Sequence, residues 1–222
     1  MSTNQDVQSM EETLNKTDLG SLINENKKTV GVIAALLVVG LIAFVGYSRV
    51  QESNQKEMLN KAFALEQKVF EAYQTNKLKP EDFLAKFQAI DSSFYGQENL
   101  YPPIIAALTK LKEDKKLNEE VMGKVQLWLN ALDKRSRLYL ITGLSVASLW
   151  EDLQKYDRSI VIYEELKKRP SDLLKDQIFF NLGRMYMKTK DKAAAQKHFE
   201  FIFKEYSDTE FAQLARLYLS GL

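Results

Sequence analysis

The chain has 222 residues, of which 45% are hydrophobic and 11% aromatic, so it is long and apolar enough to form one or two folded domains. Its 31 basic and 30 acidic residues leave a formal net charge of +1, which provides no bulk electrostatic attraction to nucleic acid. The absence of cysteine and the presence of a single histidine exclude disulfides, thiolate metal sites and cysteine nucleophiles.

The N-terminal segment, residues 1–28, is polar and shows no dense apolar periodicity. Segments of this composition do not bury enough apolar surface to offset the entropy of ordering the chain. We therefore expect a flexible tail, with at most one short helix near residues 7–14.

An uncharged apolar run follows, from Thr29 to Ser48, with lysines before it and an arginine after it. Twenty helical residues rise about 30 Å, which is the thickness of the hydrocarbon core of a bilayer. Eleven of the twenty are Val, Ile, Leu or Phe, and each favours membrane insertion by about 0.3–0.6 kcal/mol. The run predicts a transmembrane helix at 29–48 that contacts the lipid bilayer.

Two other interpretations of this run are weaker. A cleaved signal peptide normally has a shorter leader than 28 residues, and Gly46-Tyr47-Ser48 is a poor cleavage site. A buried core helix is seldom apolar on every face.

Lys27 and Lys28 flank the short N-terminal side, which favours a cytoplasmic N-terminus and a large C-terminal part outside the cytoplasm. Gly31 and Ala35 also form a weak small-residue motif for helix dimerisation.

The rest of the chain, residues 50–222, predicts an all-α domain. Apolar residues recur at three- and four-residue steps to about residue 76, and four prolines mark helix boundaries farther along. The links are short, so consecutive helices should lie antiparallel. The expected helices cover residues 81–91, 102–113, 118–132, 135–154, 156–169, 173–189, 191–206 and 209–220.

Two stretches of this domain match at a displacement of 36 residues. In each, a small residue is followed by an aromatic residue at offset three, a second small residue at offset twelve, an aromatic residue at offset sixteen and an aliphatic residue at offset nineteen. The second stretch contains Gly183, Tyr186, Ala195, Phe199 and Ile202, and the first contains Ala147, Trp150, Ser159, Tyr163 and Leu166. A helical glycine costs about 1 kcal/mol relative to alanine, so we expect two helices to cross closely at Gly183.

These residues resemble the tetratricopeptide repeat, a helical pair of 34 residues. The resemblance covers residues 140–173 and 176–209, and helix 209–220 would cap the resulting solenoid. The chain departs from the repeat pattern at Phe179, where the family has tryptophan, and at Ser207, where it has proline. Upstream, residues 50–132 give helix pairs without a match to the consensus.

The resemblance also implies a binding groove, because the first helix of each pair forms the concave wall in this family. The expected groove residues are Leu144, Ser148, Asp152, Phe180, Arg184, Met187 and Lys188. Apolar side chains among them would contact a protein partner, and Arg184 would bind a carboxylate or carbonyl. An equally open alternative is that the protein's own helices cover this face. The lysine and asparagine clamp of chaperone-tail-binding relatives is missing.

No pattern of catalytic or cofactor-binding residues is visible in the sequence. His198 is expected on the outer side of a helix, either solvated or locally hydrogen-bonded, and no glycine-rich phosphate loop occurs. Glu119–Glu120 and Glu164–Glu165 are neighbours on helices and so should not converge on one substrate. We expect no catalytic residue, metal, cofactor, nucleic acid or small-molecule substrate. The alternative of an enzyme would require a cleft lined by acidic residues, and the sequence does not identify such a set.

The whole layout is similar to the ancillary subunit of the bacterial Sec translocon, the YfgM-like family. The similarity rests on the short tail, the single span and the helix that follows it, "QKEMLNKAFALEQKVFEAY". It implies a bacterial inner-membrane protein with a periplasmic domain that links the translocon to envelope chaperones or assembly factors. The alternative is a scaffold of another envelope complex, such as the division or outer-membrane assembly machinery.

Overall fold

The structure is a computed structural model that describes residues 26–221, and every regular element in that range is a helix. The chain divides into two units, the first ending at Glu57 and the second starting at Met58. Most of the predicted tail, with its short helix near residues 7–14, lies outside the described residues. The all-α prediction is confirmed for the described part.

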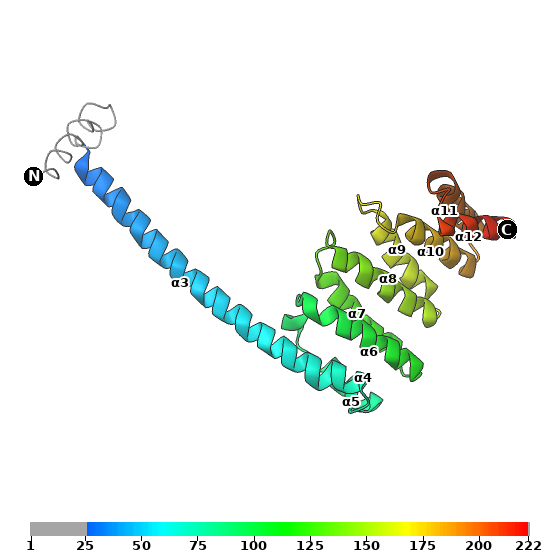
Figure 1. Cartoon of the computed structure of the whole chain (residues 1–222), viewed down its shortest axis with the longest axis horizontal. Coiled ribbons are helices and arrows are strands. Elements are labelled where there is room, and N and C mark those ends of the chain that lie inside the picture. The colour runs from blue at the N-terminus through cyan, green and yellow to red at the C-terminus, as the bar shows by residue number, and fades with distance from the viewer. Residues whose placement is uncertain (1–25, 222) are drawn as a thin grey trace, which may run out of the picture. The chain divides into compact units, whose positions relative to one another are not determined.

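The first unit contains most of helix α3, which spans Lys27–Leu65 (Figure 1). It is the one helix in the described part of the chain that is long and apolar enough to cross a membrane. None of its apolar window is buried by the rest of the protein, and Leu36, Leu41 and Phe44 are among its exposed side chains. This exposure differs from that of a core helix in a water-soluble domain, whose apolar side chains are mostly buried.

The second unit is a series of helices that follow one another in sequence order (Figure 1). Helix α3 continues into the π-helix η1 and the short α4, and two 3₁₀ turns, η2 and η3, precede α6. The bounds after α3 are η1 Glu66–Glu71, α4 Ala72–Gln74, α5 Pro80–Gln88, η2 Ser92–Phe94, η3 Glu98–Leu100, α6 Tyr101–Glu113, α7 Glu119–Ala131, α8 Arg137–Asp152, α9 Tyr156–Lys167, α10 Lys175–Lys188, α11 Lys192–Glu205 and α12 Glu210–Leu219. Each of the eight helices predicted between residues 81 and 220 is present, with ends shifted by at most three residues.

The same turn closes four helical hairpins in the second unit. A residue with positive φ follows α4, α6, α8 and α10, and these residues are Asn76, Lys115, Gln154 and Lys190. In each turn the next N–H donates to the carbonyl five residues back, at 2.8–2.9 Å, as Lys155 does to Trp150. This is the Schellman arrangement, which satisfies carbonyls at the end of a helix. The hairpin pattern therefore extends upstream of the two repeats visible in the sequence.

The close helix crossing expected at Gly183 is confirmed. A Cβ atom added there would lie 2.7 Å from Cζ and 2.8 Å from Cδ1 of Phe199, whose ring is fully buried on α11. In the preceding hairpin Ser159 is buried and its hydroxyl donates to the Ala147 carbonyl at 2.9 Å. Small residues at these positions let the paired helices approach each other closely.

A Gly183→Ala substitution is therefore expected to lower the free energy of unfolding by up to about 2 kcal/mol. Overpacking against the immobile Phe199 ring costs about 1–3 kcal/mol, against a gain of about 1 kcal/mol in helix propensity. The matched variant is Gly123→Ala, because Gly123 is helical, exposed and has nothing within 4 Å of an added Cβ. That variant should be stabilised.

Urea unfolding of the full chain in detergent micelles measures both variants. The only two tryptophans, Trp128 and Trp150, are buried in the second unit, so their fluorescence reports on this domain alone. A change of the same sign in both variants would contradict the close crossing.

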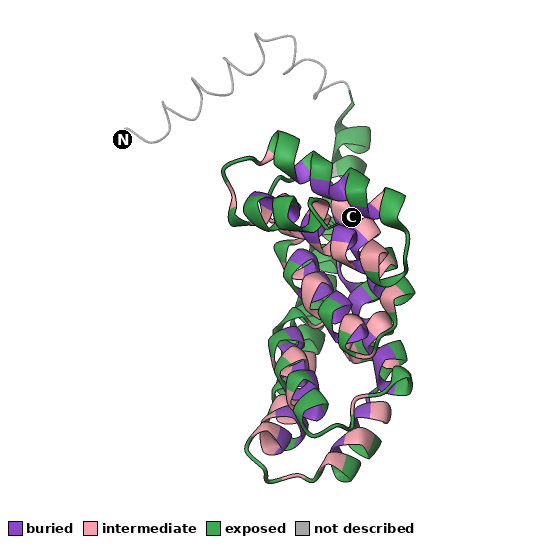
Figure 2. Cartoon of the chain, turned by 90° about the vertical axis from the view of Figure 1, so that its right-hand side faces the viewer, coloured by how far each residue is buried: buried purple, intermediate pink, exposed green. Residues whose placement is uncertain are grey.

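The buried residues of the second unit form two apolar clusters, drawn in purple in Figure 2. The larger cluster extends from Ala62 to Met185 and includes Trp128 and Trp150. The smaller one belongs to α10, α11 and α12 and is centred on Phe180 and Phe199. The partly buried Tyr186 packs against both clusters.

Candidate functional site

The three groove residues predicted on α8 lie together in one surface hollow. Leu144, Ser148 and Asp152 line a hollow of about 360 Å³, here called the α6–α8 hollow. Its other walls are side chains of α6, further residues of α8 and Gln177 from the start of α10. Side chains from α6, α8 and α10 thus contribute to one surface.

The α6–α8 hollow has an apolar part and a charged end. Leu144 and Ile105 are half-buried and pack against the main core, whereas Ser148 and Asp152 are exposed. At the charged end Lys112 Nζ lies 2.6 Å from Asp152 Oδ2, so α6 and α8 are joined by an ion pair. A pair this exposed contributes little to stability, and its polar groups remain available to a ligand.

Phe180, also predicted for the groove, is buried, so its expected exposure is wrong. Its ring centroid lies 5.4 Å from that of Phe211 and 5.6 Å from that of Tyr218, both on α12. It also lies 5.9 Å from the ring of Phe199 on α11. The C-terminal helix covers this part of α10, which was the alternative left open by the sequence.

The remaining predicted groove residues lie on α10 and do not line the α6–α8 hollow. Arg184 is engaged within the protein, with Nη2 2.5 Å from Glu151 Oε1 and Nη1 3.0 Å from Asn181 Oδ1. Met187 is half-buried against the smaller cluster, and Lys188 is exposed. A carboxylate that binds Arg184 would have to displace Glu151.

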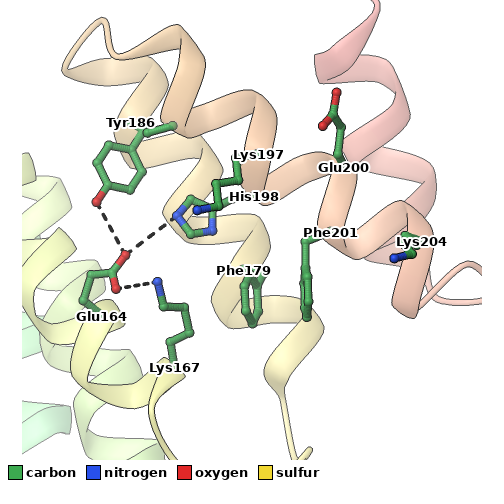
Figure 3. A pocket seen from close by; sticks show the side chains of 10 residues that line it. Glu164, Lys167, Phe179, Tyr186, Lys197, His198, Glu200, Phe201 and Lys204 are labelled. Atoms are coloured by element: carbon green, nitrogen blue, oxygen red, sulfur yellow. Dashed lines mark hydrogen bonds and ion pairs between the residues drawn. The ribbon is translucent and has the colours of Figure 1, made fainter.

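A larger hollow, which the sequence did not reveal, lies between α9 and α11 (Figure 3). Its volume is about 570 Å³, and Phe179 and Tyr186 reach it from α10. The rings of Phe179 and Phe201 stack with centroids 4.1 Å apart, so the floor is aromatic. The charged side chains that line this α9–α11 hollow are Glu164, Lys167, Lys197, Glu200 and Lys204.

Glu164 contacts three other side chains that line the α9–α11 hollow, as the dashed lines in Figure 3 show. Its carboxylate lies 2.5 Å from Lys167 Nζ and accepts a long hydrogen bond of 3.4 Å from the Tyr186 hydroxyl. His198 Nε2 lies 3.7 Å from the same carboxylate, and its ring stacks on Tyr186 at 5.4 Å. The neighbouring Glu165 pairs instead with Lys134 and Lys168, so the two carboxylates diverge as expected.

Of the two alternatives expected for His198, solvated or locally bonded, the first is wrong, because the side chain is almost fully buried. Burial disfavours the imidazolium and, together with the charge of Lys167, lowers the pKa of His198 to about 4; Glu164 opposes this shift only partly. At neutral pH the residue is therefore a neutral ring that packs between Tyr186 and Phe179. The burial of His198 was not predictable from its exposed neighbour Lys197, because adjacent residues lie on different faces of a helix.

The depressed pKa of His198 predicts a loss of stability in mild acid. The unfolded chain binds a proton near pH 6.5 whereas the folded chain does so near pH 4, so protonation favours unfolding as the pH falls between these values. From pH 7 to pH 5 the free energy of unfolding should fall by about 1–2 kcal/mol through this residue.

The comparison of wild type with His198→Gln isolates this effect. The variant starts from a lower stability because it loses ring packing, but its decline between pH 7 and pH 5 should be smaller by that amount. Equal declines in both proteins, measured by urea unfolding, would contradict a buried neutral histidine.

Both hollows present apolar and charged side chains. Among residues 26–221 no group of three or more histidine, aspartate or glutamate side chains is placed to hold a metal ion. Comparison of the chain with models of known protein families, with curated proteins and with solved structures gives no match.

Proposed function

We propose that this chain is a single-pass membrane protein whose helical domain binds segments of other proteins in the α6–α8 hollow. The observation that carries the proposal is the convergence of Leu144, Ser148 and Asp152 with side chains of α6 and α10 in that hollow. Surfaces that combine apolar contacts with a few polar groups are suited to recognition of a peptide segment.

The membrane anchor is supported by the apolar, exposed window of α3 and by the lysines at its start. The short positive flank favours an N-terminus in the cytoplasm and a second unit on the other side of the membrane. Tethering to a bilayer raises the effective concentration of the hollow for partners in the same membrane.

The resemblance in layout to the ancillary translocon subunit supports a more specific proposal. According to this more specific proposal, the domain faces the bacterial periplasm and links the Sec translocon to envelope chaperones or assembly factors. The chain acts by docking and performs no chemical step.

Photocrosslinking in intact membranes tests both levels of the proposal. A crosslinking amino acid at Ser148 should trap a distinct partner, and the variant Ser148→Arg should prevent co-purification of that partner by filling the hollow. Val161→Arg is the matched control, because Val161 is exposed on α9 away from the hollow. It should retain the partner.

The identity of the trapped protein separates the alternatives. Translocon subunits or periplasmic chaperones would support the link described above, whereas division or outer-membrane assembly proteins would support the scaffold alternative. Retention of the partner by a folded Ser148→Arg variant would show that the α6–α8 hollow is not the binding surface.

A further inference from the structure

A third hollow lies where the start of α8 meets the end of α9. Because these helices form an antiparallel hairpin, the link before α8 and the link after α9 meet at the same edge of the domain. The hollow has a volume of about 330 Å³ and is lined by Lys134, Arg135, Tyr139, Glu165, Lys168, Arg169, Pro170 and Ser171. We call it the α8–α9 end hollow.

The charge in the α8–α9 end hollow is unbalanced, with four cationic side chains and a single carboxylate. Glu165 lies 3.1 Å from Lys134 Nζ and 2.7 Å from Lys168 Nζ, so this carboxylate is already shared by two lysines. Their hydrogen bonds also lower the pKa of Glu165, which keeps it ionised. Asp133, which does not line the hollow, has its carboxylate 3.6 Å from Arg135. A net positive charge therefore remains.

Arg169 adds a second, independent observation. Its guanidinium donates to the backbone carbonyls of Lys134 and Arg135, the latter at 2.9 Å, and these bonds hold it at the base of the hollow. Its Nε atom is buried and has no hydrogen-bond acceptor in the described part of the chain. A buried charged donor without an acceptor is unfavourable, and a bound anion next to the guanidinium would offset part of this cost.

We propose that the α8–α9 end hollow binds the phosphate group of a phosphate ester. A phosphate oxyanion matches this surplus of positive charge better than a single carboxylate, and arginine and lysine are its usual ligands. The volume corresponds to about ten water molecules at about 30 Å³ each, which leaves room for the organic part of an ester. The ring of Tyr139 and Pro170 provide an apolar wall for that part.

Two sources would supply such a group, a soluble phosphate ester or the headgroup of an anionic phospholipid. Both present the same phosphate chemistry to Arg135, Lys168 and Arg169. The inference is independent of protein binding in the α6–α8 hollow, so either can fail without the other.

Isothermal titration calorimetry on the full chain in uncharged detergent micelles, with sn-glycerol 3-phosphate as the probe, tests this site. We expect saturable binding, and a dissociation constant at least about tenfold higher in Arg135→Gln/Lys168→Gln, which removes two charge-assisted donors. Both side chains are exposed, so the variant should remain folded. The control Lys77→Gln/Lys86→Gln removes the same charge from exposed positions outside the hollow and should bind as wild type does.

Repeating the titration in nanodiscs distinguishes the two sources. If a lipid headgroup occupies the hollow, discs that contain phosphatidylglycerol will weaken binding of the probe relative to discs of phosphatidylcholine alone. Equal binding in both discs identifies the soluble ester as the ligand. Absence of saturable binding in detergent, or equal effects of the two double variants, would overturn the proposal.

Discussion

Replacement of Phe199 by alanine is expected to lower the free energy of unfolding by about 3–5 kcal/mol. The ring is fully buried and fills the space left by the missing side chain of Gly183. It also lies 5.9 Å from the ring of Phe180 and 5.1 Å from that of Tyr218, so it joins three helices. Its removal leaves a cavity that the backbones of α10 and α11 cannot close without moving. Urea unfolding followed by tryptophan fluorescence measures the loss.

Phe203→Ala is the matched control, since Phe203 lies on the same helix with its side chain substantially exposed. Its loss should remain below about 1 kcal/mol, apart from a contact with Arg216. Phe180→Ala should behave like Phe199→Ala because the structure buries that ring as well. A similar, small loss in all three variants would contradict the packing of α12 on this cluster.

The second large effect is expected on membrane association, when arginines replace leucines in the apolar window of α3. Leu37→Arg/Leu41→Arg should release the protein from membranes into the supernatant of an alkaline carbonate wash. Each change from leucine to arginine near the membrane centre costs about 3 kcal/mol, so the pair costs about 6 kcal/mol. The eleven strongly apolar residues of the window contribute a total of only about 3–7 kcal/mol in favour of insertion.

The matched control is Leu214→Arg/Leu217→Arg, in which two exposed leucines of α12 are replaced by the same residue. It should remain in the membrane pellet, as the wild type does. A wild-type protein that is itself extracted by carbonate would rule out the anchor. A mature N-terminus near Arg49 would instead establish a cleaved signal peptide.

Helix positions were predictable from the sequence because periodicity and the four prolines are local signals. The register of α10 against α11 was also predictable, since a helical glycine such as Gly183 requires a close neighbour. Residues 50–132 were not recognised as repeats because their side chains do not match the repeat consensus. The left-handed turns at Asn76 and Lys115 nevertheless have the same backbone hydrogen bonds as those at Gln154 and Lys190.

Side-chain exposure was predictable only where it depends on a single helix pair. Phe180 was expected in a groove, but its burial depends on the direction in which α12 returns across α10. His198 was expected on the outer side of its helix, solvated or locally bonded, but it is buried against Tyr186 and Glu164 from two other helices. The α8–α9 end hollow escaped notice for the same reason, because its two cationic segments are more than 30 residues apart in sequence.

The division of the core into two clusters has a consequence for the way the domain opens. Helices α11 and α12 bury their apolar faces against each other and α10, and the larger cluster ends at Met185. Where helices pack mainly on their neighbours in sequence, terminal helices can detach while the others stay folded. Backbone amides of α11 and α12 should thus exchange with deuterium through a partial opening, at a lower free energy than those of α7 and α8.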